Sequence, residues 1–243
     1  MVRRRIRITG WTALTALLVT IVGFLVYFHT TFPAERDATL EVYRDDRVIV
    51  EPGDGLVVMR PAGEASDTAL LYFPGARVSA YAYLSPLLEV ASAGTTVVVA
   101  KPLMNMALFD PRGLDDFAPA APGASTWILA GHSLGGVKAC MEAADPRVSA
   151  LALFASYCAN DISSLEREVR VVLGDADGLI DIEAVEASSA LLPDSATVTT
   201  ITGANHASFG TYGAQPGDGE ARVDADQMRE AITSIINELL ATP

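Results

Sequence analysis

The chain has 243 residues, half of them hydrophobic, and a formal net charge of -13. This length suffices for one membrane segment and one domain of about 210 residues, and the recurring apolar residues exclude extended disorder. The acidic excess argues against DNA or RNA as a partner, because phosphates repel a negative surface.

The first thirty residues predict a membrane helix. Trp11–Phe28 is an uncharged run that, as a helix, would cross the hydrocarbon layer of a bilayer. The basic segment 1–10 precedes it and keeps the N-terminus in the cytoplasm by the positive-inside rule. Its arginines are Arg3, Arg4, Arg5 and Arg7. A cleaved signal peptide is the alternative, but the run is long and residues 29–34 lack a clean A-x-A site. Either way, the rest of the chain is expected outside the cytoplasm.

The polar residues 29–45 are expected to form a linker to a domain over residues 46–243. This domain opens with two β-rich runs, Arg47–Glu51 and Leu56–Met59. Pro52-Gly53-Asp54-Gly55 separates them, which is typical of an antiparallel hairpin.

After the hairpin the pattern changes to short apolar runs without alternation, which are typical of strands buried on both faces of a parallel sheet. The runs are Ala69–Phe73, Thr96–Ala100, Trp127–Ala130, Ala150–Phe154 and Val169–Leu173. The helical stretches between and after them are Ser79–Ala93, Gly135–Ala144, Asp181–Leu191 and Val223–Leu240. The sequence therefore predicts an α/β domain with a mostly parallel central sheet and helices on both faces. Ligands of such sheets bind beyond the carboxyl ends of the strands.

The run Trp127–Ala130 leads into Gly131-His132-Ser133-Leu134-Gly135 and then into a helix. This G-x-S-x-G pattern is typical of a nucleophile elbow, because so sharp a turn tolerates no side chain at the two glycine positions. Ser133 would lie at a helix N-terminus, where free N–H groups favour developing negative charge. A Walker phosphate loop is excluded, since Val137 stands where that loop has lysine.

A serine nucleophile needs a base, usually histidine, and the chain has three histidines. His29 flanks the membrane segment, and the side chain of His132 is expected to point away from that of Ser133. By elimination, His206 is the predicted base. It follows the β-rich run Thr197–Ile201 and precedes the C-terminal helix.

The acid that orients the base is expected between Ser133 and His206, which is the chain order found with a nucleophile elbow. The predicted strand Val169–Leu173 leads into Gly174-Asp175-Ala176-Asp177-Gly178, which places acids at the carboxyl end of a strand. From this position Asp175 and Asp177 both qualify, and one of them would then be an ordinary turn residue.

Five motifs carry a family resemblance. They are Tyr72-Phe73-Pro74-Gly75-Ala76-Arg77-Val78, Lys101-Pro102-Leu103-Met104-Asn105-Met106-Ala107, Gly131-His132-Ser133-Leu134-Gly135-Gly136, Gly174-Asp175-Ala176-Asp177-Gly178 and Gly203-Ala204-Asn205-His206-Ala207-Ser208-Phe209-Gly210-Thr211-Tyr212-Gly213. From Ala69 to the end, the chain resembles the α/β-hydrolase superfamily, and within it the small "family 5" set, which is dienelactone-hydrolase-like. The resemblance implies the α/β-hydrolase fold.

The resemblance also implies roles for particular residues. The acid of such hydrolases is typically the fourth residue of a G-x-x-D turn, which is Asp177 here. The oxyanion N–H groups would come from Leu134 and from Ala76, with Arg77 as the alternative to Ala76. True dienelactone hydrolases use a cysteine nucleophile, whereas this chain has Ser133, which argues against that particular activity.

Cys140 and Cys158 have no zinc-type spacing and no neighbouring histidine cluster, so no metal and no cofactor are expected. They could pair outside the cytoplasm, although small buried thiols are the commoner arrangement.

Only Ala155–Glu168 separates two predicted strands at the point where many lipases insert a lid, which indicates an open site. Phe209, Tyr212 and the Gly213–Gly219 segment could form one wall, and the segment fits a mobile surface loop equally well.

Together these features predict a membrane-anchored, extracytoplasmic serine hydrolase that cleaves a small-molecule or lipid-like carboxylic ester. An acyl-enzyme would form on Ser133, with His206 as the base and Asp177 as the orienting acid. An acyltransferase with the same triad is the nearest alternative, and a catalytically silent binding domain is the third. Nothing in the sequence indicates an oligomeric state.

Overall fold

The computed structural model describes residues 2–241. Met1 of the expected basic segment and residues 242–243 of the expected domain lie outside the described residues. Within them, the centre of the molecule is an eight-stranded sheet of order β1-β2-β4-β3-β5-β6-β7-β8. The first two strands are β1 (Val48–Pro52) and β2 (Leu56–Pro61), which form the predicted antiparallel hairpin.

The remaining strands form the parallel part of the sheet. They are β3 (Thr68–Phe73), β4 (Thr96–Ala100), β5 (Thr126–His132), β6 (Val148–Phe154), β7 (Glu168–Gly174) and β8 (Thr197–Ile201). β2 joins this part through an antiparallel pairing with β4, and every pairing from β4 to β8 is parallel. The predicted fold, a mostly parallel sheet with an opening hairpin, is confirmed.

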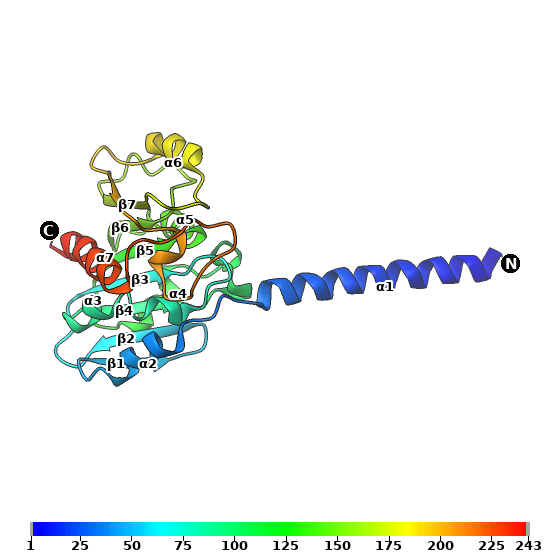
Figure 1. The fold of residues 1–243 in the computed structure, drawn as a ribbon, viewed down its shortest axis with the longest axis horizontal. Coiled ribbons are helices and arrows are strands. Elements are labelled where there is room, and N and C mark those ends of the chain that lie inside the picture. The colour runs from blue at the N-terminus through cyan, green and yellow to red at the C-terminus, as the bar shows by residue number, and fades with distance from the viewer. Residues whose placement is uncertain (1, 242–243) are drawn as a thin grey trace.

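Helices cover both faces of the sheet, so the central strands have no solvent-facing side (Figure 1). The helices α3 (Leu88–Ser92) and α7 (Ala225–Leu240) contribute buried residues to the core on one face. The helices α4 (Leu114–Phe117), α5 (Leu134–Met141) and α6 (Ile182–Ser188) contribute to the core on the other face. This double covering explains why the apolar runs of the sequence do not alternate.

Several helices differ in extent from the sequence patterns that predicted them. The stretch Ser79–Ala93 is split into a 3-10 helix, η1 (Ala80–Tyr83), and α3, with Pro86 between them, a residue that cannot continue a helix. The stretch Asp181–Leu191 forms α6 and then a 3-10 helix, η5. Besides η1, the 3-10 helices of the described residues are η2 (Leu103–Asn105), η3 (Ala107–Phe109), η4 (Ala118–Ala120), η5 (Ser189–Leu191) and η6 (His206–Phe209).

The expected polar linker, residues 29–45, contains a helix, α2 (Arg36–Arg44), that lies against β1. Its Val42 is completely buried in the core, while most of the helix faces solvent. The helix is short and mostly polar, with a single buried residue, so its composition resembles that of a linker.

The N-terminal helix α1 (Val2–His29) projects away from the domain (Figure 1). Its segment Thr9–His29 has a mean hydropathy of 2.0, and no residue of its most apolar stretch is buried against the rest of the chain. By length and composition, this helix can cross a membrane.

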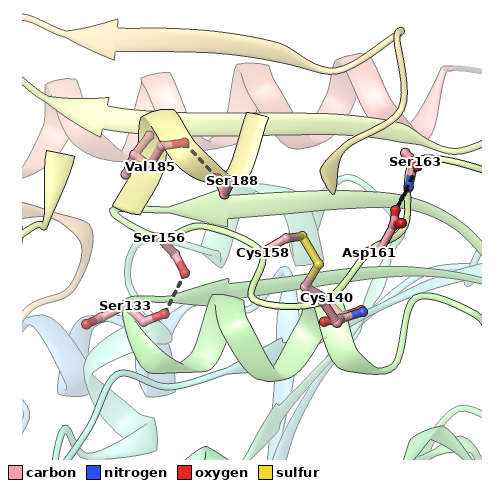
Figure 2. Close-up of a disulfide and its surroundings, with 9 residues drawn as sticks. Ser133, Cys140, Ser156, Cys158, Asp161, Ser163, Val185 and Ser188 are labelled. Carbon is pink, nitrogen blue, oxygen red and sulfur yellow. Dashed lines mark hydrogen bonds between the residues drawn. A yellow bond between two sulfur atoms is a disulfide. The ribbon is translucent and has the colours of Figure 1, made fainter. Parts of the chain in front are cut away.

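Cys140 and Cys158 form a disulfide, with their Cα atoms 5.5 Å apart. Cys140 lies in α5, and Cys158 lies in the loop after β6 (Figure 2). The structure therefore differs from the arrangement that the sequence favoured, two separate buried thiols. The reason is the sheet order: β5 and β6 are neighbours, so the helix after one strand and the loop after the other meet.

Candidate active site

Ser133 stands at the sharp turn between β5 and α5, with φ 54° and ψ -127°. This conformation is unfavourable for a residue with a side chain, and its neighbours make it possible. A Cβ atom at Gly131 would collide with the backbone of Gly135, and one at Gly135 would collide with the carbonyl oxygen of Phe73. The glycines of the motif are therefore required by close backbone packing.

Backbone strain is concentrated at one edge of the sheet. The non-glycine residues with positive φ in the described chain are Arg77, Met104, Asn105, Ser133 and Ala155. They follow β3, β4, β5 and β6 at the carboxyl ends of these parallel strands. Strain of this kind persists only where the surrounding structure enforces it, and it gathers at functional sites.

The side chains of Asp177 and His206 form a close pair at this edge. Asp177 Oδ2 lies 2.8 Å from His206 Nδ1, and the carboxylate is completely shielded from solvent. Its other oxygen, Oδ1, accepts the backbone N–H groups of Leu179 and Ile180 at 2.8 and 2.9 Å. Burial acts to raise the pKa of Asp177, but its hydrogen bond with His206, the charge of that ring and the two backbone donors hold the pKa below its usual value. Asp177 is therefore a carboxylate at neutral pH.

Asp175, the other candidate acid, does not bond to His206. Its Oδ1 accepts the backbone N–H of Gly203 at 2.7 Å and a guanidinium N–H of Arg222 at 3.1 Å. Asp175 thus connects the turn after β7 to the turn after β8, which is more than the solvated turn residue that the sequence suggested.

No hydrogen bond joins Ser133 Oγ to His206 in the described part of the chain, and catalytic bonds of this type often shorten only when substrate binds. The two residues meet through His132, which precedes Ser133. The ring centres of His132 and His206 lie 4.6 Å apart. His206 therefore packs directly against the turn that carries Ser133.

His132 is buried beneath His206 and is held by a hydrogen-bonded chain that the sequence did not reveal. The backbone N–H of Gly75 donates to Tyr83 Oη at 2.9 Å, and Tyr83 Oη lies 2.9 Å from His132 Nδ1. The Tyr83 hydroxyl accepts from Gly75 and can donate its own hydrogen to Nδ1, an arrangement in which the proton of a neutral His132 lies on Nε2. Burial and then the charge of His206 lower the pKa of His132 well below its usual value. His132 is therefore neutral at pH 7.

The N–H groups around Ser133 differ in whether they already have an acceptor. The N–H of Gly75 is bonded to Tyr83, and that of Arg77 donates to the carbonyl of Asn105 at 2.7 Å. Within residues 2–241, the N–H groups of Ala76 and Leu134 have no acceptor. The geometry thus leaves Ala76 and Leu134 able to bind an oxyanion, and it argues against Arg77.

Asp218 is a residue of this site that sequence reasoning missed. Its carboxylate accepts the backbone N–H groups of His206 at 3.1 Å, Ala207 at 2.8 Å and Gly178 at 3.1 Å. Asp218 belongs to the glycine-rich Gly213–Gly219 segment, which is therefore fixed at its end to both the acid turn and the histidine turn. An acidic residue between His206 and the last helix was the available signal in the sequence, but no motif marks it.

The expected walls of the site pack inward. Phe209 and Tyr212 are buried, with ring centres 5.9 and 6.3 Å from that of His132. Their rings therefore pack against His132. A cavity of about 340 Å³ lies behind the histidine turn, lined by Ala207 and Met228 among others. Its lining includes none of Ser133, Asp177 and His206.

The segment between β6 and β7 contains turns and no helix in the described chain, so the structure has no helical lid at this position. Ser156 in this segment donates its hydroxyl to the carbonyl oxygen of Ser133 at 2.6 Å (Figure 2). Among residues 2–241, no cluster of three or more histidine, cysteine or acidic side chains is placed to hold a metal ion.

Comparisons with known proteins agree with the fold. The model of the alpha/beta hydrolase family matches residues 69–230, which is more than half of the chain. A solved structure from Klebsiella pneumoniae subsp. pneumoniae, provisionally named as a dienelactone hydrolase, is similar with a TM-score of 0.59 and 13% sequence identity. The match covers 81% of this chain and 99% of that chain, and at this identity it shows the fold alone. A search of curated proteins finds no match. The chain belongs to the α/β-hydrolase family.

Proposed function

We propose that this hydrolase cleaves carboxylic esters through an acyl-enzyme on Ser133, with His206 as general base and Asp177 as its orienting acid. The observation that carries the proposal is the 2.8 Å contact between His206 Nδ1 and the buried carboxylate of Asp177, next to a serine on a strained elbow. This contact leaves Nε2 of His206 as the nitrogen available to the nucleophile.

The reaction would proceed in two halves. Ser133 Oγ bonds to the ester carbonyl carbon while its proton passes to His206 Nε2, and the N–H groups of Ala76 and Leu134 bind the resulting oxyanion. When the bond to the alcohol breaks, His206 gives the proton to the leaving oxygen. Water then attacks the acyl-enzyme with the same base, which releases the carboxylic acid and restores the Ser133 hydroxyl.

We also propose that α1 anchors the protein in a cell membrane, with the domain outside the cytoplasm. The length and hydropathy of Thr9–His29 support the anchor. The arginine cluster before this segment supports the orientation. The disulfide between Cys140 and Cys158 supports an oxidising compartment, because disulfides are rare in the cytoplasm.

Labelling with a fluorophosphonate tests the proposed nucleophile. The probe should modify Ser133 in the full-length protein, and Ser133→Ala should abolish labelling and lower kcat by about 10⁴ to 10⁶. Ser163→Ala is a matched control, because Ser163 is exposed and bonds only to Asp161 in the described structure. Undiminished ester turnover by the Ser133→Ala variant would overturn the mechanism.

A further inference from the structure

The end of α1 is attached to the loop that carries Ala76. The guanidinium of the next residue, Arg77, lies 4.1 Å from the ring centre of Tyr27, and its Nε donates to the carbonyl of Thr30 at 2.9 Å. The backbone N–H of Phe32 donates in turn to the carbonyl of Arg77 at 2.7 Å. The last turn of the apolar helix therefore contacts a residue adjacent to the proposed oxyanion hole.

A second attachment joins α1 to the segment after β4. The side-chain amide of Asn105 donates to the carbonyl of Phe28 at 3.0 Å, and the ring centres of Phe28 and Phe109 lie 5.7 Å apart. Because the loops after β3 and β4 both leave the sheet at its carboxyl edge, α1 contacts the domain at the same edge that carries Ser133.

Exposed apolar side chains continue from the end of α1 along this edge. Leu103, Leu108 and Phe109, here named the apolar rim, are 57%, 39% and 47% exposed. No charged residue occurs from position 102 to position 109. The 3-10 helix η3, which carries two members of the rim, packs against α5, the helix that begins directly after Ser133. The rim thus lies between the proposed anchor and the nucleophile helix.

The position of the rim follows from that of the anchor. If Thr9–His29 crosses the bilayer, the hydrocarbon layer ends near Tyr27 and Phe28, and Phe109 contacts Phe28 directly. Moving these three large apolar side chains from water into the lipid interface would lower the free energy of the protein. On the domain side, η3 packs against α5, the helix that follows Ser133, and Asn105 accepts the backbone N–H of Arg77, the residue after Ala76.

We infer that the apolar rim seats in the outer leaflet of the bilayer and that the site takes its substrate from this leaflet, an acyl ester of a membrane lipid. The inference rests on the proposed ester hydrolysis and on the proposed anchor, and it adds no chemical step to them. The acyl group is transferred to Ser133, and the lipid alcohol leaves with the proton from His206.

The test compares two esters with full-length protein in phosphatidylcholine vesicles: a fluorogenic diacylglycerol in the bilayer and p-nitrophenyl acetate in the water. Replacing all three rim residues by glutamine should lower the ratio of diacylglycerol to acetate turnover by about tenfold or more. The matched control replaces Ile49, Met141 and Val198, which are exposed apolar residues of β1, α5 and β8. The control should keep the wild-type ratio.

An unchanged ratio in the rim variant, or acetate turnover by wild-type protein without any diacylglycerol turnover, would overturn the inference while leaving ester hydrolysis intact. Failure of the proposed function has a different signature: no turnover of either ester and no fluorophosphonate label on Ser133.

A second measurement does not depend on turnover and does not need the triple variant to fold. In a Trp11→Phe background the remaining tryptophan is the buried Trp127, whose emission is subtracted using that background protein. Tryptophan placed by Phe109→Trp in this background should be quenched by brominated phosphatidylcholine in the vesicle. Tryptophan placed by Val198→Trp in the same background should not be quenched. Equal quenching of the two variants would overturn the seating of the rim.

Discussion

The backbone N–H of His206 donates to the carboxylate of Asp218 across 3.1 Å. The oxygen that accepts this N–H, Oδ1, also accepts the N–H of Gly178, the residue that follows Asp177. One side chain thus holds the turn of the proposed base and the turn of the proposed acid at once. The 2.8 Å contact between Asp177 and His206 depends on both turns, so Asp218 positions the pair without being part of it.

Asp218→Asn should weaken catalysis through this positioning. The amide keeps one acceptor oxygen and presents an NH₂ group to a backbone N–H, which leaves a donor unsatisfied at a cost of about 1–3 kcal/mol. We expect kcat on p-nitrophenyl acetate to fall by about tenfold with little change in KM. Glu220→Gln, at a nearby exposed acid, should behave like wild type. Equal kcat values for the two variants would contradict a positioning role for Asp218.

The two candidate acids should separate clearly in mutants. Asp177→Asn removes the carboxylate that holds Nδ1 of His206, and a change of this kind can lower kcat by about 10⁴. Asp175→Asn loses only part of its bonding to Gly203 and Arg222, so its main effect should be on thermal stability. The measurement is kcat for both variants on one chromogenic ester, after thermal melting has shown that each is folded. If Asp175→Asn lowers kcat strongly while Asp177→Asn has a nearly normal kcat, then Asp175 is the orienting acid in place of Asp177. The proposal of a triad would still stand.

The sequence predicted the parts of this molecule that depend on local patterns. Strands such as β4 read as unbroken apolar runs because helices cover both of their faces. Ser133 stood out because strand, glycines and helix adjoin along the chain. The contacts missed by sequence reasoning join distant positions: Asp218 with Gly178, and His132 with Tyr83. No spacing rule predicts such pairs, because they depend on which strands become neighbours.

His132 should make the stability of the fold depend on pH. Its pKa in the folded protein is lowered well below the ordinary value of about 6.5 that it regains on unfolding. Below pH 6.5 the unfolded chain therefore binds a proton that the folded chain does not, and the free energy of unfolding decreases as the pH falls. The slope from this one group approaches about 1.4 kcal/mol per pH unit.

His132→Asn removes this titration and retains a side-chain oxygen as an acceptor for Tyr83. We expect the variant to be less stable than wild type at pH 7 and to show a smaller decrease in stability between pH 7 and pH 5. Denaturant unfolding in detergent solution at several pH values gives both slopes. Parallel curves for wild type and variant would show that His132 does not carry the pH dependence.

The topology of α1 can be tested without any substrate. The arginine cluster before Trp11–Phe28 should hold the N-terminus in the cytoplasm, so a reporter fused to the C-terminus should be active only outside it. The protein should remain in the membrane fraction after carbonate washing, because a helix across the bilayer is not removed by breaking ionic contacts. Replacing the four arginines by glutamine should reduce the fraction of correctly oriented protein, while Arg36→Gln and Arg44→Gln, in α2, should leave it unchanged.

Release of a shortened, soluble domain would identify the segment as a signal peptide. It would also separate the apolar rim from the bilayer, because the contacts of Tyr27 and Phe28 with Arg77 and Phe109 would be lost with the helix.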